Sequence, residues 1–155
     1  MKNLQERVKD AKGALKAAIE EGIIPGGGVT YIQAAKALKK VTAKDPDEQM
    51  GIDLVREVLE EPLRMLAQNS GANSGEVIYK IKEKDDPSYG YDVMSGVFGD
   101  MVKAGVIEPA KVEIAALQNS ASVASMILTT DCLITDAPEK DKPAMSGAPD
   151  MGGMM

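Results

Sequence analysis

Apolar residues in the first part of the chain recur every three or four positions, which is the period of an amphipathic helix. The residues that carry this pattern are Leu4, Val8, Ala11, Leu15, Ala18 and Ile19. The spacing predicts a helix over residues 3–21. Gly22 follows directly and is expected to end it, because glycine adopts the left-handed conformation of a C-cap without strain. Asp10 falls on the polar side of this helix.

Further helices are predicted by the same periodicity along the rest of the chain. They cover residues 29–40, 47–66, 76–84, 100–104 and 110–128. Pro62 is expected to kink the third helix or to begin a second piece, because proline removes a main-chain donor. Short strands are predicted near residues 89–93 and 132–135. The pattern therefore favours a mainly α domain with about five helices and a few short strands.

Composition narrows the class of protein. The 155 residues suffice for one domain, and with no tryptophan, one phenylalanine and four tyrosines the core must be largely aliphatic. A net charge of −6 argues against nucleic acid or an anionic membrane as the main partner. No apolar run is long enough to span a membrane, and no signal peptide is expected.

Residue types that are rare or absent exclude several kinds of chemistry. The chain has no histidine, which excludes histidine-based triads and histidine-ligated zinc. Its one cysteine, Cys132, cannot form an internal disulfide and indicates a reducing compartment. We expect Cys132 to be a small buried apolar residue.

The stretch "IIPGGGV", residues 23–29, lies between two predicted helices. It lacks the lysine of a phosphate-binding loop and the spacing of a dinucleotide fingerprint. One interpretation is a helix–helix turn that needs glycine for its backbone angles. The other is that bare amides at the start of the next helix face an anionic or polar ligand. Local sequence leaves both open.

Three acidic residues have simple structural interpretations, and one of them, Asp10, has a functional interpretation as well. Asp10 is either a solvated charge or a carboxylate that orients water or holds a metal. Asp92 lies in an irregular segment, where forming a turn is the simplest role. Glu108 precedes Pro109 and suits the positive end of a helix dipole.

Several motifs taken together resemble the C-terminal part of a group I chaperonin, the GroEL type. They are "RVKDA", "AAIEEGIIPGGGV", "PLRMLAQNSG", "YGYDVMSG", "DMVKAGVIEPAKV", "ALQNSASVASMILTTDCLITD" and the terminal "MGGMM". The resemblance covers nearly the whole chain. It implies that residues 1–25 belong to an intermediate-domain helix and residues 26–136 to the second half of the helical equatorial domain. Residues 137–155 correspond to a flexible Gly/Met tail.

The resemblance also implies a nucleotide site for ATP or ADP. Gly27 aligns with the glycine whose backbone lies against the nucleotide, and Asp10 with the aspartate that activates the attacking water. Residues around the adenine align with Asp92, Val93 and Met94. Glu108 aligns with the aspartate that binds the ribose hydroxyls.

The phosphate loop of the family, of the form Gly-Asp-Gly-Thr-Thr, does not occur in this sequence. We expect the ligands for Mg²⁺ and K⁺ in an N-terminal part and none in this chain, which alone should not hydrolyse ATP. The expected partners are other subunits of a homo-oligomeric ring, a cochaperonin and unfolded client proteins, in the cytoplasm. The alternative is a truncated, non-catalytic helical assembly module.

The resemblance also implies that other segments take part in assembly. Arg64 and the loop 69–75 correspond to ring–ring contacts. Asn73 occupies a position of that loop where the family sometimes has an acidic salt-bridge partner. Residues 132–135 correspond to a strand that pairs with a neighbouring subunit. The helix 110–128 should expose a large apolar face unless other equatorial helices cover it.

Overall fold

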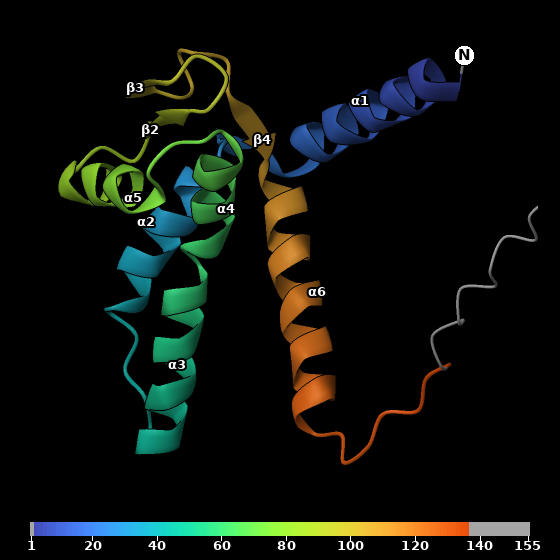
Figure 1. Ribbon diagram of the computed structural model, residues 1–155, viewed down its shortest axis with the longest axis vertical. Coiled ribbons are helices and arrows are strands. Elements are labelled where there is room, and N and C mark those ends of the chain that lie inside the picture. The colour runs from blue at the N-terminus through green and yellow to red at the C-terminus, as the bar shows by residue number, and fades with distance from the viewer. Residues whose placement is uncertain (1, 137–155) are drawn as a thin grey trace, which may run out of the picture.

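Six helices and four short strands make up the residues that the computed structural model describes, which are 2–136 (Figure 1). In chain order they are α1 (Lys2–Glu21), β1 (Ile23–Pro25), α2 (Val29–Leu38), α3 (Pro46–Val58), α4 (Glu61–Asn69), α5 (Ser74–Glu83), β2 (Tyr89–Asp92), β3 (Val97–Asp100), β4 (Ile107–Pro109) and α6 (Ala110–Leu128). The predicted mainly α fold with a few short strands is confirmed.

The helix boundaries follow from capping residues. Gly22 ends α1 at φ +83° and donates its N–H to the carbonyl oxygen of Ala18 at 2.9 Å, as expected of a glycine C-cap. The side chain of Asp45 caps α3 by accepting a hydrogen bond from the N–H of Glu48 at 2.8 Å. Pro62 lies in the first turn of α4, so it begins a separate helix as one of the two predicted outcomes.

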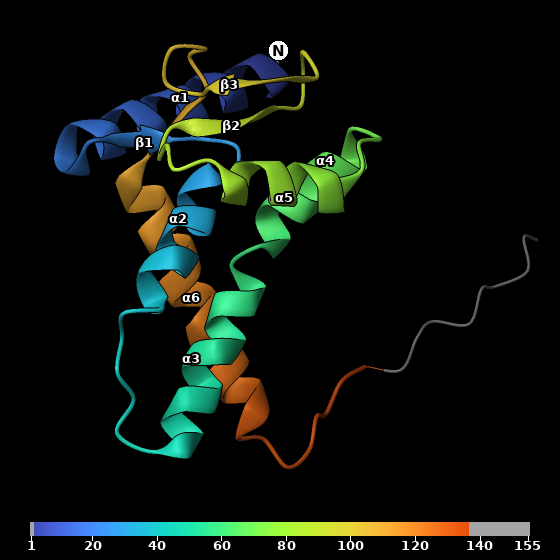
Figure 2. The ribbon, with the colours of Figure 1, turned by 90° about the vertical axis from the view of Figure 1, so that its left-hand side faces the viewer.

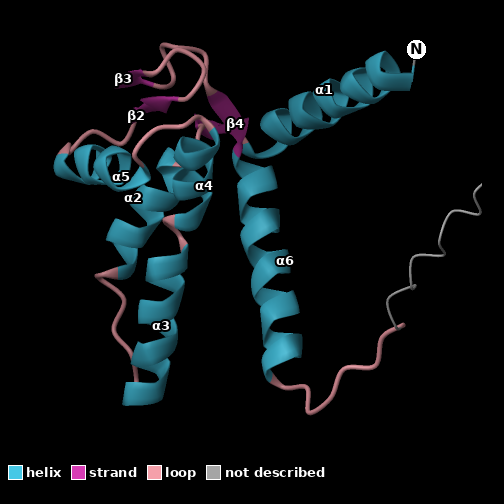
Figure 3. Ribbon diagram, viewed as in Figure 1, coloured by secondary structure: helices cyan, strands magenta, loops and turns pink. Residues whose placement is uncertain are grey.

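The strands form two antiparallel pairs at one end of the helices (Figure 3). Strand β1 pairs with β4, and Ile24 lies opposite Glu108. Strands β2 and β3 form a hairpin in which Tyr91 lies opposite Phe98. Strand β1 was not predicted, because three residues are too few for a pattern and its partner lies more than eighty positions away. Figure 2 shows that α2 and α3 are joined at the end far from the strands.

A small aliphatic core joins α2, α4 and α5 beneath the β2–β3 hairpin. Its buried members are Ile32, Leu63, Ala67, Val77, Ile78 and Ile81, and the aromatic residues of the hairpin pack against them. Gly90 has to be glycine, since a Cβ atom there would lie 2.4 Å from Cγ2 of Val29. The hairpin is thereby held against the start of α2, next to the glycine turn.

Two helices lie outside this core. Within the described part of the chain, neither α1 nor α6 has a buried residue. Figure 1 shows α1 projecting away from the strands and α6 standing apart from α2 and α3. The exposed apolar residues of α6 are Val112, Ile114, Leu117, Val123, Met126, Ile127 and Leu128. The expectation that this helix exposes an apolar face is confirmed.

The helix predicted over residues 100–104 is wrong. Residues 100–104 do not form a helix: Asp100 pairs with Tyr89 in the hairpin, and a turn follows up to Gly105 at φ +77°. The last helix covers Ala110–Leu128 as predicted, and Glu108 lies in strand β4 directly before it.

Predictions near the end of the chain have mixed outcomes. Residues 132–135 form no strand within the described chain, since a strand needs a partner for its main-chain groups. Cys132 is exposed, not buried. The predicted tail, 137–155, lies outside the described residues. Between residues 2 and 136, no helix combines the length and the apolarity that crossing a membrane requires.

Candidate functional site

The glycine turn between β1 and α2 has three members in different environments. Gly27 and Gly28 both have left-handed backbones, with φ +69° and +78°. Gly26 and Gly28 are buried, whereas Gly27 is only half-buried. Gly27 is therefore the member of the turn that is most open to a ligand.

Close packing explains the two buried glycines. A Cβ atom on Gly28 would lie 3.0 Å from the main-chain nitrogen of Leu63 at the start of α4. A Cβ atom on Gly26 would lie 3.1 Å from Oε1 of Glu108. At Gly27 the nearest atoms would be the carbonyl oxygen of Tyr91 and Cγ1 of Val106, both at an ordinary 3.9 Å. Gly27 is thus needed for its backbone angle and not for lack of space.

The amides of the turn are hydrogen-bonded to β4 and to the residue before it. The N–H of Gly26 donates to the carbonyl oxygen of Val106 at 2.9 Å. The N–H of Gly27 donates to Oε1 of Glu108 at 3.0 Å. The interpretation of bare amides therefore does not describe these two groups, because Val106 and Glu108 supply acceptors that local sequence could not reveal.

Glu108 lies in a partly buried and acidic environment. Burial raises the pKa of its carboxyl group, the hydrogen bond from Gly27 opposes that rise, and the neighbouring Glu113 adds to it. Tyr31 of α2 donates its hydroxyl to the carbonyl oxygen of Glu113 at 3.2 Å. Burial, followed by Glu113, raises the pKa of the Tyr31 phenol as well. Tyr31 and Glu113 were not predicted at this site, since nothing in their local sequence distinguishes them from a core tyrosine and a helix-dipole charge.

Asp92 organises the turn of the β2–β3 hairpin. Its Oδ1 accepts from the N–H of Met94 at 2.9 Å and its Oδ2 from the hydroxyl of Ser95 at 2.6 Å. These bonds hold the pKa of Asp92 below its usual value, the Ser95 bond contributing most. Met94 is almost fully exposed and Val93 is half-buried. The turn-forming role proposed for Asp92 is confirmed, and its hairpin lies beside Gly27 through Tyr91.

Gly27, Glu108 and the carbonyl oxygen of Tyr91 lie at one corner of the structure, and Asp10 lies apart from this corner. It is exposed in the middle of α1, eleven positions before the helix ends at Glu21. At the rise of an α-helix this corresponds to roughly 16 Å along the axis. Figure 1 shows that α1 runs away from β4 in that direction. The structure thus brings Gly27 and Glu108 together, with Tyr91 of the hairpin beside Gly27, and leaves Asp10 outside.

The family model of the TCP-1/cpn60 chaperonins matches residues 1–138. This chain belongs to the TCP-1/cpn60 chaperonin family. The match spans every described element, from α1 to the segment after α6. Membership supports a chaperonin-type role in assisting protein folding and assembly with other subunits.

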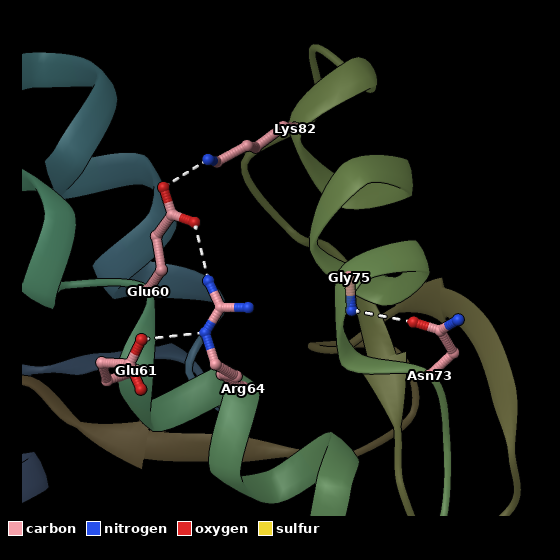
Figure 4. Close-up of polar contacts among 6 residues, drawn as sticks. All are labelled: Glu60, Glu61, Arg64, Asn73, Gly75 and Lys82. Atoms are coloured by element: carbon pink, nitrogen blue, oxygen red, sulfur yellow. Dashed lines mark hydrogen bonds and ion pairs between the residues drawn. The ribbon is translucent and has the colours of Figure 1, made fainter.

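By the resemblance, Arg64 and the loop 69–75 of this chaperonin correspond to ring–ring contacts. In the structure, Arg64 forms ion pairs within the chain (Figure 4). Nε of Arg64 lies 2.8 Å from Oε1 of Glu61, and its Nη2 lies 3.5 Å from Oε2 of Glu60, which also pairs with Lys82. Asn73 instead caps α5, accepting hydrogen bonds from the N–H groups of the next helix turn. In Figure 4 the Asn73 side chain turns toward Gly75 and not toward Arg64.

A groove of about 630 Å³ lies between α2, α3 and α5 of this chaperonin chain. Lys36, Lys39, Asp53, Arg56 and Glu57 contribute to its lining, and none of the predicted nucleotide residues does. Among residues 2–136, no three acidic or cysteine side chains are grouped so that they could hold a metal ion.

Proposed function

We propose that this chain is part of an ATP-dependent chaperonin of the GroEL type, and that the corner around Gly27 receives the nucleoside of ATP or ADP. The observation that carries the proposal is the hydrogen bond from Gly27 N–H to Oε1 of Glu108 at 3.0 Å. It joins two residues eighty-one positions apart, both of which the resemblance assigns to one nucleotide site. The hairpin bearing Asp92 borders the same corner.

The chemistry of this corner fits the nucleoside half of the ligand. A carboxylate such as Glu108 accepts hydrogen bonds from ribose hydroxyls. Gly27 offers a half-exposed main chain with no side chain, so a ligand can approach it closely. Main-chain and side-chain groups of Asp92, Val93 and Met94 would lie beside the base.

Asp10 has the role of orienting the attacking water in this proposal. ATP supplies the phosphoryl group, and its transfer to water needs a phosphate cradle, Mg²⁺ with K⁺, and a positioned nucleophile. Because Asp10 is exposed on the projecting α1, that helix has to swing toward the nucleotide before Asp10 can act. In the assembled chaperonin, Asp10→Asn should leave nucleotide affinity within about twofold and lower ATP turnover by about 100-fold or more. Unchanged turnover would remove Asp10 from the mechanism.

The wider assembly follows from the same proposal. The chain would act within a homo-oligomeric double ring in the cytoplasm, together with a cochaperonin and unfolded client proteins. The cradle and the cation ligands would come from residues outside this sequence. The purified 155-residue chain should therefore release no phosphate from ATP above the buffer rate.

Calorimetric titration of ADP into the 155-residue chain tests the nucleoside corner. Gly27→Ala should weaken binding about tenfold or more, equivalent to about 1.4 kcal/mol. Gly71→Ala is the matched control, because Gly71 has a similar φ of +79° in open space on the α4–α5 loop. Equal affinities for the two variants, or no binding to the unaltered chain, would refute the proposal.

A second candidate is a helical assembly module without ATPase activity. What favours it is the exposure of α6, which has no buried residue within the described chain, together with the internal use of the Gly26 and Gly27 amides. Size-exclusion chromatography combined with the ADP titration separates the two candidates. A ring-sized particle that fails to bind nucleotide would favour the assembly module.

A further inference from the structure

We propose that Met94 is a reversible oxidation site: a peroxide converts its thioether to the sulfoxide, and the sulfoxide weakens binding of the nucleoside. The oxidation itself depends only on the exposure of this side chain. Its effect on binding rests on the proposed function, which places Met94 beside the base.

Met94 is the most exposed of the methionines that the structure describes. It is 92% exposed, compared with 71% for Met50, 60% for Met126 and 51% for Met65. Met101, which directly follows β3, is only 1% exposed. Because a peroxide has to reach the sulfur atom to oxidise it, Met94 should react first and Met101 last.

The turn of the β2–β3 hairpin presents Met94 to solvent in a fixed main-chain conformation. Oδ1 of Asp92 accepts from the N–H of Met94 at 2.9 Å, and Oδ2 accepts from the hydroxyl of Ser95 at 2.6 Å. The N–H of Gly96 donates to the carbonyl oxygen of Asp92 at 2.8 Å. None of these bonds uses the Met94 side chain, so a sulfoxide can form there without breaking the turn.

The same oxidation at a packed methionine would damage the fold. The side chain of Met101 fills the space beside Gly90, where a Cβ atom on Gly90 would lie 2.7 Å from its Cγ. A polar sulfoxide in such a place disrupts the core. Met94 has little packing to lose, because it is almost fully exposed. Its oxidation should therefore change the chemistry of the surface and leave the fold intact.

The reaction at Met94 is the transfer of one oxygen atom. The S–O bond forms as the O–O bond of hydrogen peroxide breaks, and the rest of the peroxide leaves as water. The sulfur loses two electrons and the peroxide gains them. Methionine sulfoxide reductases reverse the change, with a thiol as the reductant.

The two states of the side chain should differ in their contact with a base. A thioether makes favourable contacts with an aromatic ring, and a purine base is such a ring. The sulfoxide is polar and well hydrated, so covering it with the base costs part of its hydration. Oxidation of Met94 should therefore lower the affinity for the nucleoside.

Peptide mapping by mass spectrometry tests the oxidation, on the full 155-residue chain treated with dilute hydrogen peroxide and without nucleotide. We expect the Met94 peptide to gain one oxygen atom about tenfold faster than the Met101 peptide, or faster still. Circular dichroism should stay unchanged while Met94 reacts. Oxidation of Met50 or Met101 ahead of Met94, or unfolding in step with Met94 oxidation, would overturn the proposal.

Calorimetric titration of ADP tests the effect on binding. Peroxide treatment of the unaltered chain should weaken binding about threefold to tenfold, and methionine sulfoxide reductases with dithiothreitol should restore it. Met94→Leu should have the same affinity before and after treatment, because leucine is apolar, similar in size and not oxidised. Met65→Leu is the matched control and should stay sensitive. The exposed Cys132 also reacts with peroxide, but it does so in every variant.

The outcomes separate this proposal from the proposed function. An affinity that peroxide leaves unchanged, or one that falls equally in Met94→Leu, would overturn the effect of the sulfoxide. If the untreated chain binds no ADP, the proposed function fails and the effect on binding fails with it. The peptide map needs no nucleotide, so it still decides whether Met94 is the oxidation site.

Discussion

The carboxylate of Glu108 accepts a hydrogen bond from the main-chain N–H of Gly27 at 3.0 Å, and the same oxygen lies where a side chain on Gly26 would have to fit. One side chain of β4 therefore fixes the turn that leads from β1 into α2. A charge-assisted hydrogen bond of this kind is among the stronger polar contacts in a protein.

Removing this acceptor should loosen the turn. Glu108→Ala leaves the half-buried Gly27 amide without its partner, and we expect a loss of about 1–3 kcal/mol in the free energy of unfolding. Glu108→Gln keeps an acceptor oxygen in place and should lose less. Urea denaturation followed by circular dichroism measures both. Equal stability of Glu108→Ala and the unaltered chain would mean that the bond contributes nothing.

Glu108 and Asp92 should make the stability of the chain depend on pH in opposite directions. The pKa of Glu108 is raised above the ordinary 4.5, so its contribution is complete below that value and is lost as pH rises through the raised pKa. The pKa of Asp92 is lowered below 3.8, so its contribution is complete above that value and is lost as pH falls through the lowered pKa.

Two variants check these signs. In urea denaturation across a pH series, Glu108→Gln should flatten the decline on the higher-pH side only. Asp92→Asn should flatten the decline on the acidic side only. A Glu108→Gln curve parallel to that of the unaltered chain above pH 4.5 would contradict the raised pKa.

Gly28 should tolerate substitution worse than a glycine with the same backbone angle elsewhere. Gly28→Ala adds the strain of φ +78° to a 3.0 Å contact with the main chain of Leu63, and should cost about 2–5 kcal/mol. Gly71→Ala has φ +79° with nothing nearby, and should cost about 1–2 kcal/mol. Similar thermal midpoints for the two variants would show that the approach of α4 does not constrain the turn.

The exposed apolar residues of α6 should promote self-association. Val123 and Ile127 are 50% and 69% exposed, and a double change of both to glutamate should lower binding of an apolar dye and shift the chain toward monomer in sedimentation. Val97→Glu is the control, since Val97 is 60% exposed on the hairpin. If the control lowers dye binding as much as the double change, α6 is not the responsible surface.

Sequence alone predicted the helices well where a cap or a breaker is present, as at Gly22 and Pro62. It failed where tertiary pairing overrides local preference. Asp100 suits a helix start, yet the hairpin draws it into β3. Strand β1 is too short to show a pattern, and the residue that binds Gly27 lies eighty-one positions away. The resemblance placed Gly27 and Glu108 at one site, but no feature of the sequence pointed to Tyr31 or Glu113.

The central claim is that the Gly27 corner receives a nucleoside. The most direct measurement is the change in amide NMR shifts when ADP is added to the ¹⁵N-labelled chain. We predict saturable shifts at Gly27, Asp92, Val93 and Met94, with none at Gly71. Shifts confined to other parts of the chain, or a spectrum unchanged at saturating ADP, would contradict the claim.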